Sequence, residues 1–270
     1  MINFENNRMD ELSKVSIITV VYNNVKYIRS AIDSVLSQTY QNIEYIVIDG
    51  GSKDGTVEII EEYKDQISIF VSEPDKGIYD ALNKGILEAS GDVIGILHSD
   101  DLYCDERVIS DSLQKMKDVN AEVCFSDMII IDSESEKIIR YYMAHYFKRW
   151  LFRIGWMPPH PTSFFKRTLF DEFGLYSLSY KVVGDFDFFV RIFYGRIISW
   201  VYLERVTVKM RLGGISNSGF SSKRQIANEI NLSLRANKVW SISVLQLGRY
   251  FIRAMELIIR PKNGKFTDVD

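Results

Sequence analysis

Short β-branched apolar runs alternate with helical apolar spacing from residue 15 to about residue 125 of this 270-residue chain. Residues 15–22 (VSIITVVY) have the length and branching of a buried strand, and residues 27–36 repeat apolar side chains at helical spacing. This unit recurs as residues 43–48 with 56–63, 67–71 with 78–87, and 93–97 with 107–116, followed by a fifth strand at 123–125. The pattern predicts an α/β fold with a mainly parallel sheet and helices on both faces.

The pattern loosens after about residue 128. The expected elements are a hairpin at 128–139 turning at 132–136, a loop at 150–161, a helix at 185–193, a strand at 197–210, a helix at 222–240 and a basic amphipathic helix at 241–260. We therefore expect a polar segment at residues 1–14, one α/β domain at 15–220 and a helical, basic extension at 221–270. The last helix either packs on the core or lies in a membrane interface, where arginines meet anionic lipid.

Charge is distributed unevenly along the chain, although the whole carries only −3. Residues 1–135 contain 11 Lys and Arg against 26 Asp and Glu, whereas residues 136–270 contain 22 against 10. The basic half fits an anionic partner such as a phosphate-bearing acceptor or a membrane surface, and the alternative is that the two halves attract each other. Dispersed basic residues without a recognition motif argue against a nucleic-acid partner.

Cysteine usage and hydropathy favour a cytoplasmic protein. Cys104 and Cys124 have no CxxC partner and no neighbouring ligand set, which indicates a reducing environment and small packing residues. Residues 1–14 lack the apolar stretch of a signal peptide, and no run of 18 apolar residues predicts a membrane span.

Polar residues follow each of the first strands, where ligands bind in parallel sheets. Residues 49–56 (DGGSKDGT) form a Gly-rich turn that is neither a dinucleotide fingerprint nor a P-loop, and Asp49 would accept a hydrogen bond from a base or ribose. Lys76, near a helix N-terminus, suits a diphosphate. Asp100 and Asp101 leave a buried strand as adjacent carboxylates, which suits Mg²⁺ or Mn²⁺ held against substrate phosphates.

Four ordered segments resemble the bacterial family 2 glycosyltransferases: residues 16–23 (SIITVVYN), 49–56, 75–85 (DKGIYDALNKG) and 99–101 (SDD). The resemblance covers residues 15 to about 215. It implies a GT-A fold, which is a Rossmann-like, mainly parallel sheet flanked by helices. It also implies a nucleotide-diphospho-sugar donor, a divalent metal ion and transfer with inversion at the anomeric carbon.

The motif match also implies roles for individual residues. Tyr22 and Asp49 would contact the nucleoside, Lys76 and Asn83 would lie near ribose or diphosphate, and Asp100 and Asp101 would hold the metal beside the donor. Two positions depart from the family pattern. Many relatives carry a second acidic residue at the position of Gly50 and Asp at that of His98. Both departures concern nucleoside and ribose recognition, and a UDP-sugar is the favoured donor. His98 is either a further ligand of the metal ion, a contact to the ribose or a histidine hydrogen-bonded within the protein.

An inverting displacement needs a carboxylate that takes the proton of the acceptor hydroxyl. Residues 184–191 (GDFDFFVR) resemble the acidic motif of the family at the start of a helix. Asp187 and Arg191 have the spacing of an ion pair, whereas Asp185 has Phe189 four residues on, so Asp185 is the predicted general base and Asp187 is structural. Helix capping is the alternative role for Asp185.

Two further segments match acceptor-side and donor-side loops. Residues 158–163 (PPHPTS) place His160 as a contact for an acceptor hydroxyl or phosphate, unless it is a buried, hydrogen-bonded histidine. Residues 211–217 (RLGGISN) resemble a loop that closes over the donor, where Arg211 would offset diphosphate charge, and a plain flexible connection is the alternative.

The sequence therefore predicts a cytoplasmic, metal-dependent inverting glycosyltransferase, active on a glycan acceptor in surface polysaccharide synthesis. A lipid-pyrophosphate acceptor would bring the protein to the inner face of the membrane. A sugar-nucleotide nucleotidyltransferase is one rival, although the Gly-rich triphosphate loop that it needs is absent after the first strand. A non-catalytic sugar-nucleotide-binding module is the other.

Overall fold

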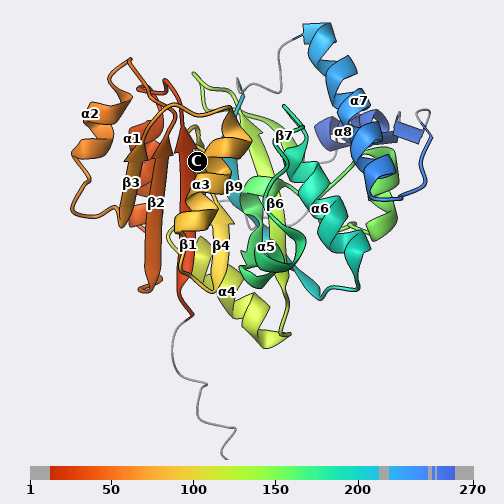
Figure 1. Cartoon of the computed structure of the whole chain (residues 1–270), viewed down its shortest axis with the longest axis horizontal. Coiled ribbons are helices and arrows are strands. Elements are labelled where there is room, and N and C mark those ends of the chain that lie inside the picture. Colours follow the sequence, from red (N-terminus) through yellow and green to blue (C-terminus); the bar gives the residue numbers. More distant parts are fainter. Residues whose placement is uncertain (1–12, 213–218, 243–244, 247, 259–270) are drawn as a thin grey trace, which may run out of the picture.

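A computed structural model describes residues 13–212, 219–242, 245–246 and 248–258 (Figure 1). The described strands are β1 (Val15–Val21), β2 (Ile43–Asp49), β3 (Ile69–Ser72), β4 (Val93–Ile96), β5 (Asp101–Tyr103), β6 (Val123–Ile131), β7 (Ile138–Tyr142), β8 (Phe164–Lys166) and β9 (Trp200–Arg211). The described helices are α1 (Ile28–Leu36), α2 (Thr56–Glu61), α3 (Ile78–Glu88), α4 (Val108–Asp118), η1 (Arg149–Ile154), η2 (His160–Thr162), α5 (Thr168–Phe173), α6 (Gly184–Gly195), α7 (Gly219–Ala236) and α8 (Gly248–Ile258).

The described strands form one mixed sheet in the order β3-β2-β1-β4-β8-β6-β9-β5, with β7 paired to β6. Strands β3, β2, β1 and β4 are mutually parallel, as predicted. Strand β8 is antiparallel to both β4 and β6, and β9 is parallel to β6. The predicted α/β fold with a mainly parallel sheet is confirmed, and antiparallel pairs complete its second half.

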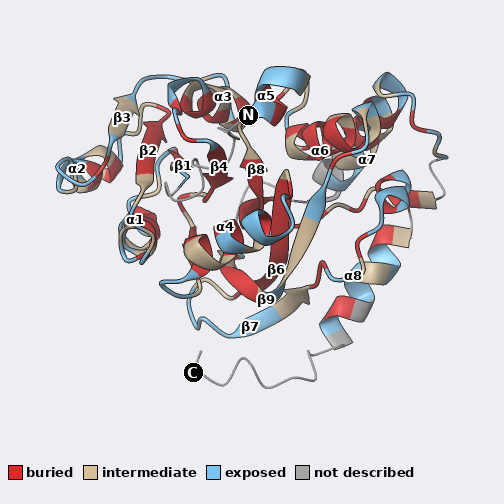
Figure 2. Cartoon of the chain, turned by 90° about the horizontal axis from the view of Figure 1, so that it is seen from below, coloured by how far each residue is buried: buried red, intermediate tan, exposed pale blue. Residues whose placement is uncertain are grey.

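Helices cover both faces of the sheet (Figure 2). Helices α1 and α4 lie on one side, and α3, α5 and α6 lie on the other. Alternate side chains of one strand supply both cores: Ile17 packs with the α1 and α4 side, and Ile18 packs with the α3 and α6 side. This two-sided burial explains why the strands are almost uniformly apolar.

Several details differ from the sequence-based expectations. Residues 150–161, expected as loop, contain most of η1 and the beginning of η2. Of the helix expected at 241–260 the structure describes α8, from Gly248 to Ile258, while residues 243–244, 247 and 259–260 lie outside the described residues. The three-residue strands β5 and β8 and the helix α5 were not predicted, because such short elements hardly show periodicity.

Helix α8 packs on β7 through one face. Glu256 is 2% exposed, accepts a hydrogen bond from Tyr146 Oη (3.0 Å) and lies 3.5 Å from Arg140 Nη1. The opposite face leaves Phe251 and Leu257 largely exposed. The helix therefore packs on the core through one face, and its placement in a membrane interface stays a prediction. None of the described helices is long and apolar enough to cross a bilayer.

Candidate active site

The loops that follow β1, β2 and β4 are tied together at one edge of the sheet. Val21 pairs with Asp49 in register, so β1 and β2 end side by side. Asn24 Nδ2, after β1, donates to Ser99 Oγ, after β4 (2.8 Å), and the backbone N–H of Asn23 donates to Ser52 Oγ (2.7 Å). The predicted motifs thus converge at the carboxyl ends of the parallel strands, where such folds bind ligands.

Asp49 lies at this edge but is fully buried. Its Oδ2 accepts hydrogen bonds from the backbone N–H groups of Gly51 and Ser52 (both 3.0 Å) and from Ser72 Oγ (2.7 Å). Its Oδ1 accepts a hydrogen bond from Ser52 Oγ. The carboxylate therefore holds the turn after β2, and the predicted contact with the nucleoside remains a prediction.

The other residues predicted to bind the nucleotide-sugar donor differ in whether their side chains are exposed or already hydrogen-bonded within the protein. Tyr22 is 64% exposed at the end of β1, and Lys76 is exposed before α3. Asn83 instead clamps the backbone of Tyr176: its Nδ2 donates to the carbonyl (2.8 Å) and its Oδ1 accepts from the N–H (2.9 Å). Because both ends of this amide are engaged, Asn83 acts here as a tie between α3 and the segment before α6.

Asp100 and Asp101 follow β4, and Asp101 is only 2% exposed. Burial, and then the neighbouring carboxylate of Asp100, raise the pKa of Asp101 well above its ordinary value. Among the described residues no side chain donates a hydrogen bond to Asp101, so its negative charge calls for a proton or a cation. Carboxylate oxygens are the ligand type that Mg²⁺ and Mn²⁺ prefer. The described residues contain no group of three or more His, Cys, Asp or Glu that could hold a metal ion, so metal binding by Asp100 and Asp101 stays a prediction.

Arg211 is the last residue of β9, contacts the segment that contains Asp100 and Asp101, and is 6% exposed. Its Nη1 donates to the Asp100 carbonyl and to Ser30 Oγ (both 3.2 Å), and its guanidinium lies 4.7 Å from the ring centre of Tyr27. Arg211 therefore braces the acidic segment from within. That Arg211 offsets the charge of the donor diphosphate stays a prediction, and residues 213–217 of the matched loop lie outside the described residues.

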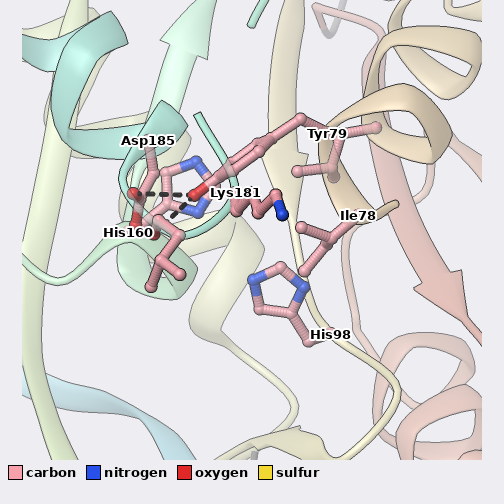
Figure 3. Close-up of a pocket in the computed structure, with 8 residues that line it drawn as sticks. Ile78, Tyr79, His98, His160, Lys181 and Asp185 are labelled. Carbon is pink, nitrogen blue, oxygen red and sulfur yellow. Dashed lines mark hydrogen bonds between the residues drawn. The ribbon is translucent and has the colours of Figure 1, made fainter. Parts of the chain in front are cut away.

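A cavity of about 110 Å³ is lined by His98, two residues before Asp100, and by residues of α3 and α6 (Figure 3). Its lining comes from three regions: α3, the segment after β4, and the chain from η2 to α6. The lining residues are Ile78, Tyr79, Leu82, His98, His160, Lys181, Val182 and Asp185. Asp185, His160 and His98 thus share one hollow, while Asp49, Asp100 and Asp101 are not part of its lining.

Asp185 begins α6 and faces this cavity (Figure 3). Its Oδ1 accepts hydrogen bonds from Tyr79 Oη (3.1 Å) and from the backbone N–H of Phe186 (2.8 Å). Both bonds end on the same oxygen, so Oδ2 has no hydrogen-bond partner among the described residues. Burial raises the pKa of Asp185 to about 6, and hydrogen bonding from Phe186, from Tyr79 and from its own backbone opposes the increase. A carboxylate with such a pKa is suited to accepting a proton near neutral pH.

The contact between Tyr79 and α6 depends on Gly184. A Cβ at this position would lie 2.8 Å from Tyr79 Cζ, which is closer than side chains approach. The single hydroxyl proton of Tyr79 is shared between the Val182 carbonyl (2.8 Å) and Asp185 Oδ1 (3.1 Å). Tyr79 is thereby fixed from two sides, and it holds the carboxylate of Asp185 in place.

Asp187 points away from the cavity and is 3% exposed. Its Oδ2 accepts a hydrogen bond from Arg191 Nε (2.9 Å), the spacing expected from the sequence. Its Oδ1 accepts hydrogen bonds from Ser233 Oγ (2.8 Å) and Asn237 Nδ2 (3.1 Å) on and just after α7. Asp187 therefore fastens α6 to α7.

Two histidines, His98 and His160, line the same cavity as Asp185, and their ring centres are 6.1 Å apart. His160 is 3% exposed and its Nε2 shares a hydrogen bond with Tyr176 Oη (2.8 Å). Burial lowers the pKa of His160 to about 3, so its imidazole is neutral. His98 Nδ1 is shielded from solvent and has no partner among the described residues. A neutral imidazole with an open nitrogen is able to bind a hydroxyl group.

Sequence reasoning did not single out Tyr79 or Lys181 as site residues. Tyr79 lies inside the quoted segment 75–85, where helical spacing marks it as a core residue. Lys181 precedes α6 by three positions and reaches the cavity from an exposed segment. Nothing in its local sequence signals this position, because the approach of η2, α3 and α6 is set by tertiary packing.

The structure thus has a Rossmann-like, mainly parallel sheet with acidic side chains at the carboxyl ends of its parallel strands. The sequence profile of glycosyl transferase family 2 matches residues 16–176, more than half of the chain. The chain belongs to glycosyl transferase family 2 and is an enzyme that uses a nucleotide-sugar donor. This confirms the family resemblance found in the sequence.

Relatives by sequence are bacterial glycosyltransferases. An uncharacterized glycosyltransferase of Mycobacterium tuberculosis is 29% identical over 226 residues, which cover 80% of each chain. An uncharacterized glycosyltransferase of Rickettsia typhi is 34% identical over 208 residues, covering 73% of this chain and 64% of the relative. A PGL/p-HBAD biosynthesis glycosyltransferase of Mycobacterium bovis is 29% identical over 208 residues, covering 75% and 79%.

Solved structures confirm the GT-A-like fold. Residues 1–349 of S. aureus TarS, in complex with UDP-GlcNAc, superpose with a TM-score of 0.66 at 16% identity, covering 82% of this chain and 66% of that one. The mannosyltransferase PcManGT from Pyrobaculum calidifontis, in complex with GDP-Man and Mn²⁺, gives a TM-score of 0.60 at 14% identity, covering 91% and 81%.

Proposed function

We propose that this enzyme transfers a sugar from a nucleotide-diphospho-sugar, with a UDP-sugar favoured, to a glycan acceptor by a single inverting displacement. The observation that carries this proposal is the position of Asp185. Asp185 lines a cavity that it shares with His98 and His160, and its raised pKa of about 6 suits a general base.

In the proposed reaction, Asp185 Oδ2 takes the proton of the acceptor hydroxyl as that oxygen bonds to C1 of the sugar. The bond between C1 and the diphosphate oxygen breaks, and the nucleoside diphosphate leaves. Tyr79 fixes the carboxylate through Oδ1, which leaves Oδ2 for the acceptor. His160 and Lys181 line the same cavity and are proposed to contact the acceptor.

The proposed metal site consists of Asp100 and Asp101, which would hold Mg²⁺ or Mn²⁺ against the diphosphate. A bound cation would stabilise the negative charge that develops on the leaving group. The structural relative PcManGT, whose complex contains GDP-Man and Mn²⁺, supports this choice of ion. The residues of this chain contribute the two carboxylates, and Arg211 positions the loop that carries them.

A thermal-unfolding panel of nucleotide sugars, with and without Mn²⁺, tests the donor proposal. A donor that binds the folded state raises the midpoint by mass action, and we expect Mn²⁺ to enlarge that shift. The Asp101→Asn variant provides the matched comparison, because it should lose the Mn²⁺-dependent part. No shift with any nucleotide sugar would refute the proposal. A sugar-nucleotide nucleotidyltransferase would instead be stabilised by a nucleoside triphosphate.

We also propose that the acceptor is presented at the inner face of a membrane, in surface polysaccharide synthesis. Exposed apolar residues gather on η1, on α8 and after α7: Trp150, Trp240, Ile242, Tyr250, Phe251 and Leu257. Exposed basic residues on or next to these segments are Lys148, Arg149, Arg153, Arg235, Lys238 and Arg253. Aromatic and basic side chains together suit an anionic lipid interface.

Contacts hold these segments together. Ser241 Oγ donates to the Arg153 carbonyl (2.6 Å), and a Cβ built on Gly248 would lie 3.5 Å from Ile154 Cδ1. Co-sedimentation with phosphatidylglycerol vesicles tests the membrane proposal. Phe251→Asp should weaken binding, whereas Leu87→Asp, an equally exposed position on α3, should not. Equal pelleting of the two variants, or no pelleting of the wild type, would contradict it.

A further inference from the structure

Three groups converge on one point at the edge formed by β1, β2 and β3. A Cβ built on Gly50 would overlap Asp75 Oδ2, and it would lie 3.1 Å from Asp75 Cγ and 3.3 Å from Tyr22 Cδ2. The space that a side chain at position 50 would fill is therefore occupied by the carboxylate of Asp75, from the loop after β3. The exposed ring of Tyr22 borders the same space.

The two carboxylates at this edge differ in their freedom to bind a ligand. Asp49 is fully buried and accepts four hydrogen bonds from the turn and from β3. Asp75 is partly exposed, and its Oδ1 accepts a hydrogen bond from the Gly77 N–H (2.7 Å). Its Oδ2 has no hydrogen-bond partner among the described residues. Asp75 is thus the carboxylate that remains open.

The loop that carries Asp75 is held in place. The backbone N–H of Glu73 donates to the Asp49 carbonyl (3.0 Å), and the N–H of Lys76 donates to Asp80 Oδ2 (3.0 Å). A fixed acceptor beside an exposed aromatic ring matches the two requirements for reading a base. The ring gives a stacking surface for any base, and the acceptor selects among base edges.

We propose that Asp75, in place of Asp49, recognises the base of the donor nucleotide while the base stacks on Tyr22. This inference rests on the proposed function and names the residue that selects the nucleotide. A carboxylate accepts a hydrogen bond from the ring N–H of uracil or guanine. The corresponding ring nitrogen of cytosine or adenine is itself an acceptor and is repelled. Asp75 therefore selects UDP over CDP, or GDP over ADP.

Calorimetric titration of the full chain with UDP, CDP, GDP and ADP in the presence of Mn²⁺ tests the assignment. We expect the wild type to prefer UDP over CDP, or GDP over ADP, by at least about tenfold, since a hydrogen bond to a charged acceptor is among the stronger ones. Asp75→Asn should abolish this ratio, because an amide can donate as well as accept. Inorganic pyrophosphate should bind both proteins equally.

Glu73→Gln is the matched control, because it removes one negative charge from the same loop. Glu73 pairs with Lys84 (2.7 Å) and is not among the groups that surround the Cβ position at Gly50, so this variant should keep the wild-type ratio. An unchanged ratio in Asp75→Asn would overturn the assignment, as would equal losses for nucleotides and pyrophosphate. If the wild type bound none of the four nucleotides, the proposed function itself would fail as well.

Discussion

Replacing Asp185 by Asn should stabilise the protein at alkaline pH while it removes the proposed base. The pKa of Asp185 is raised from 3.8 to about 6, chiefly by burial. At about 1.4 kcal/mol per pKa unit, ionisation of this carboxyl costs the fold at most about 3 kcal/mol. The amide of Asn carries no charge, and its oxygen can still accept the hydrogen bonds from Tyr79 and Phe186.

The sign of the effect depends on pH. Because the pKa is raised in the folded state, the contribution of Asp185 to stability is fully present below about pH 4 and is lost as pH rises to about 6. The gain from Asp185→Asn should therefore be largest at about pH 8, at 1–3 kcal/mol or several degrees in the unfolding midpoint, and small at about pH 4.

Thermal unfolding at the two pH values measures this difference. Asp187→Asn is the control, because it weakens the contacts to Arg191 and Ser233 and should destabilise the protein at both pH values. The reasoning would be refuted if Asp185→Asn were no more stable than the wild type at about pH 8, or if its gain were the same at about pH 4.

Three further predictions follow from other contacts. Asp101→Asn should lower the affinity for Mn²⁺ in the presence of UDP by at least about tenfold without lowering the unfolding midpoint, since burial already disfavours the ionised form of this carboxyl; titration calorimetry checks this, and unchanged affinity would contradict it. Asn83→Ala should cost about 1–3 kcal/mol in urea unfolding, because it leaves the buried Tyr176 backbone unpaired. Gly85→Ala should cost a similar amount, because its Cβ would lie 2.5 Å from Ile18 Cγ2, and a midpoint equal to that of the wild type would disprove either claim.

The parallel half of the fold was predictable because its strands are buried on both faces. The almost uniformly apolar run at Val15–Val21 predicts such a strand, and the helix that follows it, α1, has a clear apolar stripe. The short strands β5 and β8 were not predictable, since three residues hardly carry a period. Their places are set by pairing with β9 and with β4 and β6, which are distant in sequence.

The sequence allowed us to predict which segments carry candidate site residues, but not whether each side chain is free to bind a ligand. The spacing of Asp187 and Arg191 indicated an ion pair, and the structure has it. The engagement of Asn83 with Tyr176 and the closed environment of Asp49 depend on contacts 93 and 23 positions away in the chain. Such contacts decide whether a polar side chain is free to bind a ligand, and local sequence does not encode them.

Sugar transfer by Asp185→Asn and Asp187→Asn, compared below their unfolding temperatures, tests the central claim most directly. The account predicts that Asp185→Asn lowers kcat by a factor of about 10² to 10⁴ with little change in donor affinity, whereas folded Asp187→Asn keeps most of its activity. Near-normal turnover in Asp185→Asn together with an inactive, folded Asp187→Asn would contradict it.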